Sequence, residues 1–407
     1  MSGLLKIKTI DFANLVIAKG VNFFLTALLF SQIAIGMNQQ IFADFGYWWS
    51  IAIMVGGIML GGVSSALIRV VILQGTLRRF ASYLHYIFLV FSIALFGITL
   101  IHTDSDDFAV FFGVLILFGI AVQLQTVVLG LIRVLAASRA NFLASITTAT
   151  IIFLIVHIIL GDRRELILVF GTLSTAYLCG AVVALLFAYR YLENLFKPVK
   201  FVNSGVSFFS NAAAFTSVNI FSYGILNIDF TLFRLLGSPQ DFAIMATGKV
   251  FFERFALPAL LVFSGAASLH VLRSPHDKAK SESNLQIKIS YLLVAMFVIT
   301  VVGLGFAYKI FASKIRGDAN TIGLMHSIFV SGGYLLFAVN AVLMDLLVIR
   351  RSLRVVLFHI VMFIIFAVVL QGLMIIFFGI PGWALGWPLF NIMILLVLFK
   401  TAGVIIA

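Results

Sequence analysis

Residues 355–378, VVLFHIVMFIIFAVVLQGLMIIFF, decide the fold class of this 407-residue chain. The run contains no Asp, Glu, Lys or Arg, and about 20 such apolar residues are enough for one helix to cross a bilayer. Similar runs recur along the chain, which is 62% hydrophobic and 10% charged. Because a soluble domain carries about 25% charged residues, the composition predicts a polytopic integral membrane protein.

Apolar runs between polar breaks predict twelve transmembrane helices, joined by short connections that leave no room for a soluble domain. They lie near residues 12–35, 48–72, 82–101, 108–132, 142–160, 166–189, 206–232, 242–270, 289–309, 322–348, 355–378 and 383–404. The similar strings KGVNFF (19–24) and SGVSFF (204–209) each lie at the start of a six-helix half. We therefore expect an all-α fold of two six-helix bundles, formed by residues 1–199 and 200–407.

The basic residues predict the orientation in the membrane. With the N-terminus in the cytoplasm, seventeen of the 27 Lys and Arg residues fall on the inner side, six on the outer side and four within spans. This bias favours two cytoplasmic termini, because Lys and Arg resist translocation. The tryptophans are expected near the outer interface, where amphipathic rings are enriched. Since the basic residues act as topology signals, the net charge of +12 does not indicate a nucleic-acid partner.

The stretch MATGKVFFERFALP (245–258) places three charges inside a predicted span. A Lys or Arg at a helix centre costs about 2.5–3.5 kcal/mol, so such residues face a protein interior or a water-filled cavity. Lys249 and Glu253 are four residues apart and can pair on one helix face, which leaves Arg254 as a net positive charge. The alternative interpretation is a buried salt bridge that only fixes this helix to its neighbours.

Polar side chains form stripes on three other predicted helices. Such stripes can simply hydrogen-bond across helices, but several together favour an aqueous interior. They are Lys19, Asn22 and Thr26 on the first helix; Gln123, Thr126 and Arg133 on the fourth; and Asn219, Ser222, Tyr223 and Asn227 on the seventh.

The sign of the charges in this interior favours an anionic ligand. The predicted cations are Lys19, Arg69, Lys249 and Arg254 within spans, with Arg133 at a helix end. The acids in spans are few, namely Glu253 and Asp345, with Asp11 near the entry to the first helix. A cationic cavity suits phosphate oxygens, for which Arg is well matched.

Several activities lack their sequence signals. The chain has no G-x-x-x-x-G-K-[ST] loop for ATP hydrolysis, no H-E-x-x-H motif, and one cysteine. We expect neither a metal nor a cofactor. No nucleophile and base are arranged as an intramembrane active site would require, so a transporter is expected rather than an enzyme.

Two stretches carry a family resemblance. NQQIFADFGYWWSIAIMVGGIMLGGVSSALIRVV (38–71) resembles the second-helix region of bacterial polysaccharide flippases of the Wzx type, with a short turn at Phe45-Gly46 and a small-residue stretch that closes on Arg69. NIDFTLFRLLGSPQDFAIMATGKVFFERF (227–255) resembles their junction between helices seven and eight, although Ala243-Ile244-Met245 replaces the usual Gly-x-Tyr. These flippases belong to the multidrug/oligosaccharidyl-lipid/polysaccharide exporter superfamily.

The resemblance implies two bundles around a central cavity, alternating access, and location in the bacterial inner membrane. The implied substrate is an undecaprenyl-diphosphate-linked oligosaccharide, with a polysaccharide polymerase and a chain-length regulator as further partners. The cationic residues above would bind the diphosphate while the lipid tail stays in the bilayer, and Asn22, Asn219, Tyr223 and Asn227 would line the cavity. Glu253 or Asp345 could couple transport to an ion.

Two alternatives remain. An ion-coupled small-molecule exporter of the MATE type, from the same superfamily, predicts acidic residues in the first six spans, where only Asp11 lies at an edge. A membrane-embedded enzyme of envelope synthesis, such as a polymerase, predicts a long outer loop or a paired His/Asp site, and the sequence has neither.

Overall fold

The computed structural model of the chain is helical apart from two three-residue strands, in the part that it describes. The described residues are 9–56, 106–135, 138–160, 165–195, 208–253, 285–287, 291–316, 321–350, 353–402 and 404–406. The predicted span at 82–101 lies outside them, as do the later part of the second span and the part of the eighth after residue 253.

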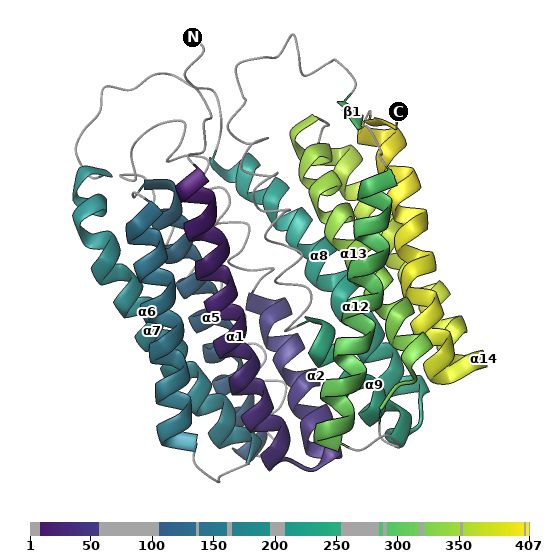
Figure 1. The fold of residues 1–407 in the computed structure, drawn as a ribbon, viewed down its shortest axis with the longest axis horizontal. Helices are drawn as coiled ribbons and strands as arrows, with labels where there is room; N and C mark the ends of the chain where they lie inside the picture. The colour runs from purple at the N-terminus through teal and green to yellow at the C-terminus, as the bar shows by residue number, and fades with distance from the viewer. Residues whose placement is uncertain are drawn as a thin grey trace. The chain divides into compact units, whose positions relative to one another are not determined.

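The described helices agree with the predicted spans to within a few residues at most ends (Figure 1). Among them, six are long and apolar enough to cross a membrane: α5, α6, α7, α12, α13 and α14. The helices are α1 (Thr9–Gly36), α2 (Gln39–Gly56), α5 (Asp106–Leu135), α6 (Ser138–Leu160), α7 (Leu166–Leu195), α8 (Phe208–Leu236), α9 (Pro239–Phe251), α12 (Tyr291–Arg316), α13 (Leu324–Arg350) and α14 (Leu353–Ala402).

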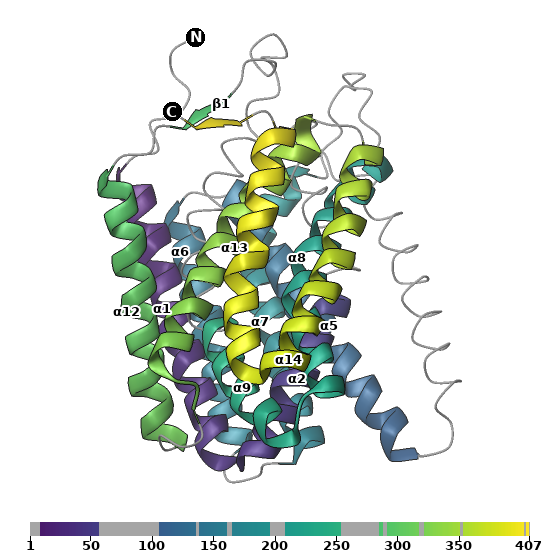
Figure 2. The same cartoon turned by 90° about the vertical axis from the view of Figure 1, so that its right-hand side faces the viewer.

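Helix α14 is two antiparallel arms, as the two predicted spans at 355–378 and 383–404 require. The break is at Gly379, whose φ of 57° is a left-handed conformation that glycine adopts without a steric penalty. The arms contact each other along their length, since the Phe366 and Phe390 rings stack at 5.8 Å and His359 Nε2 lies 3.3 Å from Thr401 Oγ1. Figure 2 shows the two arms side by side, and Trp387 on the second arm packs on Phe337 of α13.

Two helix boundaries correct the sequence analysis. Asn38 Oδ1 accepts a hydrogen bond from Ile41 N at 2.8 Å, a cap that starts α2 at Gln39, so Gly46 lies inside the helix and not in a turn. Helix α12 continues to Arg316, whereas the sequence analysis ended this span at residue 309. Three of the six basic residues counted on the outer side are therefore helical: Lys309, Lys314 and Arg316.

The chain forms two compact units, which comprise residues 1–30 with 48–216 and residues 31–47 with 217–407. The hairpin between α1 and α2 thus belongs to the second unit. The predicted division between residues 199 and 200 falls outside the described residues and stays a prediction.

Glycines bring two helices of the first unit into close contact. A Cβ added to Gly119 on α5 would lie 2.5 Å from the Ala52 carbonyl oxygen, and one added to Gly56 would lie 2.6 Å from the Gly119 carbonyl oxygen. Small residues at such a crossing let two backbones approach within a membrane. Beside it, Trp49 packs against Phe30 and Phe118 with ring centroids 4.9 and 4.4 Å apart.

Aromatic rings also fill the second unit. Phe252 stacks on Tyr308 and Tyr334 at 5.3 and 5.7 Å, and Trp387 lies 5.4 Å from Tyr334. Trp383 and Trp387 are buried, as is Trp49 in the first unit, so these three rings pack against other side chains, and their place near the outer interface stays a prediction.

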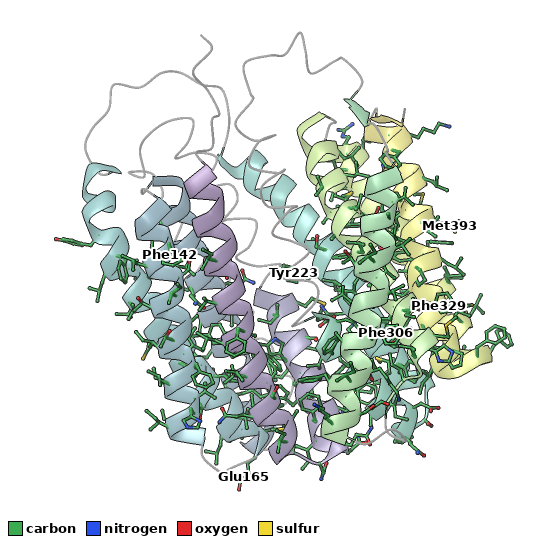
Figure 3. All side chains as sticks on the ribbon, viewed as in Figure 1. Phe142, Glu165, Tyr223, Phe306, Phe329 and Met393 are labelled. Carbon is green, nitrogen blue, oxygen red and sulfur yellow. The ribbon has the colours of Figure 1, made fainter. Side chains whose placement is uncertain are left out.

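Apolar side chains also project outward, as a lipid environment requires. Phe306 and Met393 are about half exposed and are labelled in Figure 3. Near one end of the second unit, strands β1 (Leu285–Ile287) and β2 (Val404–Ile406) pair in parallel, with Leu285 opposite Val404. The sequence analysis did not predict this pair.

Candidate functional site

Three charged side chains meet inside the second unit, and we call them the buried charge cluster: Asp229 on α8, Lys249 on α9 and Glu253 just after α9. Their side chains are 1%, 0% and 7% exposed. The Lys249 ammonium contacts Asp229 Oδ1 and lies 3.2 Å from Glu253 Oε1. The pairing of Lys249 with Glu253 that their four-residue spacing predicted is therefore present.

The turn between α8 and α9 places Asp229 beside Lys249. Pro239 occupies the first turn of α9, and Ser238 Oγ accepts a hydrogen bond from Asp241 N at 3.1 Å, which fixes where that helix begins. The chain therefore reverses between the two helices. Asp229 and Lys249 lie at similar distances from the turn in sequence, so an antiparallel hairpin brings them to the same depth.

Asp229 has two further hydrogen bonds. Trp383 Nε1, on the second arm of α14, donates to Asp229 Oδ2 at 2.8 Å, and the backbone N of Phe230 donates to Oδ1, also at 2.8 Å. Hydrogen bonds to an ionised group are about twice as strong as those between neutral groups. The carboxylate is thus held from α8, α9 and α14 together.

Aromatic rings cover the ammonium group. Lys249 Nζ lies 4.7 Å from the Phe230 ring centroid and 6.0 Å from that of Trp387. Ring faces attract a cation, and the attraction grows when the cation is removed from water. The same rings lower the local dielectric, so the interactions among the three charges are strong.

The cluster carries one cation and two carboxylates, which is a formal charge of −1 when both acids are ionised. We expected a net positive charge here, from Lys249 and Glu253 with Arg254; Arg254 lies outside the described residues. A burial cost of several kcal/mol per ion makes an uncompensated charge expensive. A single proton on either carboxylate would bring the formal charge of the cluster to zero.

Two of the predicted cavity residues lie on α8, close to the cluster in sequence. Asn227 is buried, and its Nδ2 donates to the Tyr223 carbonyl at 2.6 Å. Among the described residues, Asn227 Oδ1 has no hydrogen-bond partner. Tyr223 is half-buried and is labelled on α8 in Figure 3. The two residues share one face of the helix, as their spacing predicted.

The other candidate residues are not placed by the structure. Lys19 and Asn22 on α1, Arg133 on α5, Asn219 on α8 and Asp345 on α13 lie on described helices, but their side chains lie outside the described part. Arg69 and Arg254 lie outside it altogether. Convergence of these cations on one central cavity therefore stays a prediction.

Sequence analysis missed Asp229 and Trp383 as members of the site. Asp229 lies within the seventh predicted span but was counted neither in its polar stripe nor among the acids in spans. Asp229 and Lys249 carry opposite charges and lie at similar distances in sequence from the turn between the two helices. This pattern could have predicted their contact. Nothing local marks Trp383, because its contact with Asp229 depends on how the distant α14 packs.

Comparisons with known proteins find likeness in structure alone. No family model and no curated protein matches the chain. A mutant of the MATE transporter VcmN from Vibrio cholerae is similar over 96% of this chain and 94% of its own, with 13% identity and a TM-score of 0.62. The outward-facing conformation of a multidrug resistance MATE family transporter of the MOP superfamily is similar over the same shares, with 12% identity and a TM-score of 0.63.

An inward-facing conformation of such a transporter covers 95% of this chain and 97% of its own, with 12% identity and a TM-score of 0.50. At these identities the likeness shows the fold alone, and it confirms the predicted all-α membrane fold of two bundles. A relationship to the Wzx-type flippases in particular is not shown.

Proposed function

We propose that this protein is an ion-coupled membrane exporter of small organic molecules that works by alternating access, with the buried charge cluster as its coupling site. The contacts of Lys249 are the observation that carries the proposal. Its ammonium is fully buried and is already contacted by two carboxylates, so it is unavailable to a diphosphate. This favours the alternative of the sequence analysis over its main interpretation.

Protonation supplies a physical link between the cluster and a conformational change. While both acids are ionised, Asp229 attracts Lys249 and accepts from Trp383, which holds α8, α9 and α14 together. A proton on Asp229 removes the charge from both contacts and weakens the junction of the three helices. A conformation in which they separate then becomes relatively more stable, which is how binding shifts a population.

The MATE transporters of the same fold support this proposal, because one of them is described as a multidrug resistance transporter seen facing outward and another as facing inward. We place the protein in the bacterial inner membrane with both termini in the cytoplasm, as the distribution of Lys and Arg favours.

A lipid-linked oligosaccharide flippase is the second candidate. The excess of cations over acids in the predicted spans favours it, and Lys19, Arg69, Arg133 and Arg254 would then bind the diphosphate of an undecaprenyl-linked substrate. In that case a polysaccharide polymerase and a chain-length regulator would be partners, and Lys249 would have a structural role.

Export of the fluorescent cation ethidium tests the main proposal. Cells that lack their own dye exporters are loaded with ethidium, and efflux is compared among wild type, Asp229→Asn, Glu253→Gln and Asp241→Asn at equal membrane levels. Asp241 is the matched control, because this acid lies on α9 away from the cluster. We expect a protonophore to stop efflux by the wild type, Asp229→Asn to lower it at least about tenfold, and Asp241→Asn to retain it.

Efflux that neither the protonophore nor Asp229→Asn affects would refute ion coupling at the cluster. The flippase candidate is separated by a second readout, the surface polysaccharide of cells that carry Arg69→Ala or Arg254→Ala. Loss of polysaccharide with no ethidium export by the wild type would favour the flippase.

A further inference from the structure

The Lys249 ammonium is surrounded like a bound metal cation. Three oxygens lie around it: the Leu226 carbonyl and Asp229 Oδ1 accept hydrogen bonds from it, and Glu253 Oε1 is 3.2 Å away. Carbonyl and carboxylate oxygens are the ligands that hard cations take in proteins. An ammonium group has three N–H donors and a single positive charge, so it matches such a set of oxygens.

The backbone of α8 contributes to this arrangement. The Leu226 carbonyl accepts a hydrogen bond from the Lys249 ammonium, and the Phe230 amide, one turn further along, donates to Asp229 Oδ1. A carbonyl oxygen of α8 thus faces the cation, as one would face an ion bound beside the helix.

We infer that Lys249 is a tethered cation that takes the place of a sodium ion, so that the transporter is driven by protons and does not bind sodium. The inference rests on the proposed coupling role of the cluster, but its test does not. A sodium ion entering the site would meet a fixed positive charge in its own position. A proton needs no set of ligands, because it adds to one carboxylate oxygen.

The groups that face the Lys249 ammonium come from α8, α9 and α14. On α9 and α8 the acidic groups that face it are Glu253 and Asp229, and α14 presents the indoles of Trp383 and Trp387. The further titratable groups nearby, among the described residues, are Tyr308 and Tyr334, which pack on Phe252. Removing the ammonium would take from Asp229, Glu253 and the Leu226 carbonyl their contacts with Lys249.

The test measures thermal unfolding of the purified full-length protein in detergent, with sodium chloride or choline chloride at matched concentrations. A ligand that binds only the folded state raises the melting temperature, and the rise depends on its concentration. We expect the wild type to give the same melting temperature in both salts. Lys249→Ala should be stabilised by sodium, in a saturable manner, and not by choline.

Two controls test whether the sodium-dependent rise in melting temperature arises at the buried charge cluster. Lys309→Ala removes another lysine, which donates to Thr321 Oγ1 at 2.9 Å, and should show no preference for sodium. The double variant Lys249→Ala/Asp229→Asn should lose the sodium response, because one of the two carboxylates is gone. If Lys249→Ala fails to fold, Lys249→Asn replaces it, since its shorter side chain leaves space and adds an amide oxygen.

Sodium-specific stabilisation of the wild type would overturn the inference, and so would its absence in folded Lys249→Ala. If neither variant folds, the melting temperatures of the wild type in the two salts alone test the inference. Sodium could stabilise Lys249→Ala while Asp229→Asn exports ethidium normally. That result would contradict the coupling role of the cluster and would still support Lys249 as a cation in the place of sodium.

Discussion

The indole of Trp383 donates to Asp229 Oδ2 at 2.8 Å, although the two residues are 154 positions apart in the chain. This hydrogen bond joins the second arm of α14 to α8. Because Asp229 also contacts Lys249, the bond places three helices of the second unit around one carboxylate. The stability of the unit should therefore depend on this indole more than on a neighbouring one.

Trp383→Phe should lower the free energy of unfolding by about 1.5–3 kcal/mol beyond the effect of the smaller ring, because it removes a hydrogen bond to a charged group. Trp387→Phe is the matched control. Trp387 is equally buried, and its Nε1 has no hydrogen-bond partner within the described residues. Thermal and chemical unfolding in detergent measures both variants, and equal losses would contradict a role for the Trp383 hydrogen bond.

The pair of Asp229 and Lys249 predicts strong coupling between two substitutions. Asp229→Leu or Lys249→Met alone should cost about 3–5 kcal/mol, since each leaves a buried charge without its partner. The double variant should cost clearly less than the two single costs together. A double-mutant cycle on unfolding free energies measures this, and additive losses would show that the contact contributes little.

The close crossing of α2 and α5 predicts opposite outcomes for two glycines of one helix. Gly119→Ala should destabilise the first unit by about 1–3 kcal/mol, because its Cβ would lie 2.5 Å from the Ala52 carbonyl oxygen. At Gly113 an added Cβ meets no atom within 4 Å, so Gly113→Ala should be neutral or stabilising. Melting temperatures compare the two, and a tolerated Gly119→Ala would contradict the crossing.

The ion pair of Asp44 and Arg234 should contribute little to stability. Arg234 Nη1 lies 3.1 Å from Asp44 Oδ1, with side chains 38% and 27% exposed, and the guanidinium stacks on Tyr47 at 4.4 Å. We expect a coupling energy of about 0.2–1 kcal/mol from the cycle of Asp44→Asn and Arg234→Gln. The coupling should fall at high salt, and a larger, salt-independent value would contradict a solvent-screened pair.

Much of the fold follows from the sequence because membrane spans are fixed by length and hydrophobicity. The run at residues 355–378 predicts a helix with no knowledge of its neighbours, and the structure ends that arm at Gly379. Boundaries set by capping are harder to predict. Asn38 begins α2 well before its apolar run, so Gly46 was taken for a turn residue.

The site was predicted in part, for a related reason. Lys249 and Glu253 are four residues apart on one helix, so local geometry predicts their contact. Asp229 reaches Lys249 across a turn, and Trp383 reaches Asp229 only through the packing of α14. The expected net positive charge stays a prediction, because Arg254 lies outside the described residues, and Asp229 adds a carboxylate that was not counted.

Proton flux into proteoliposomes tests the central claim most directly. The purified protein is reconstituted with a trapped pH-sensitive dye, and ethidium is added to start exchange for protons. We predict ethidium-dependent proton movement by the wild type and by Asp241→Asn, and none above protein-free liposomes by Asp229→Asn. Proton movement by Asp229→Asn equal to that of the wild type would contradict coupling at the buried charge cluster.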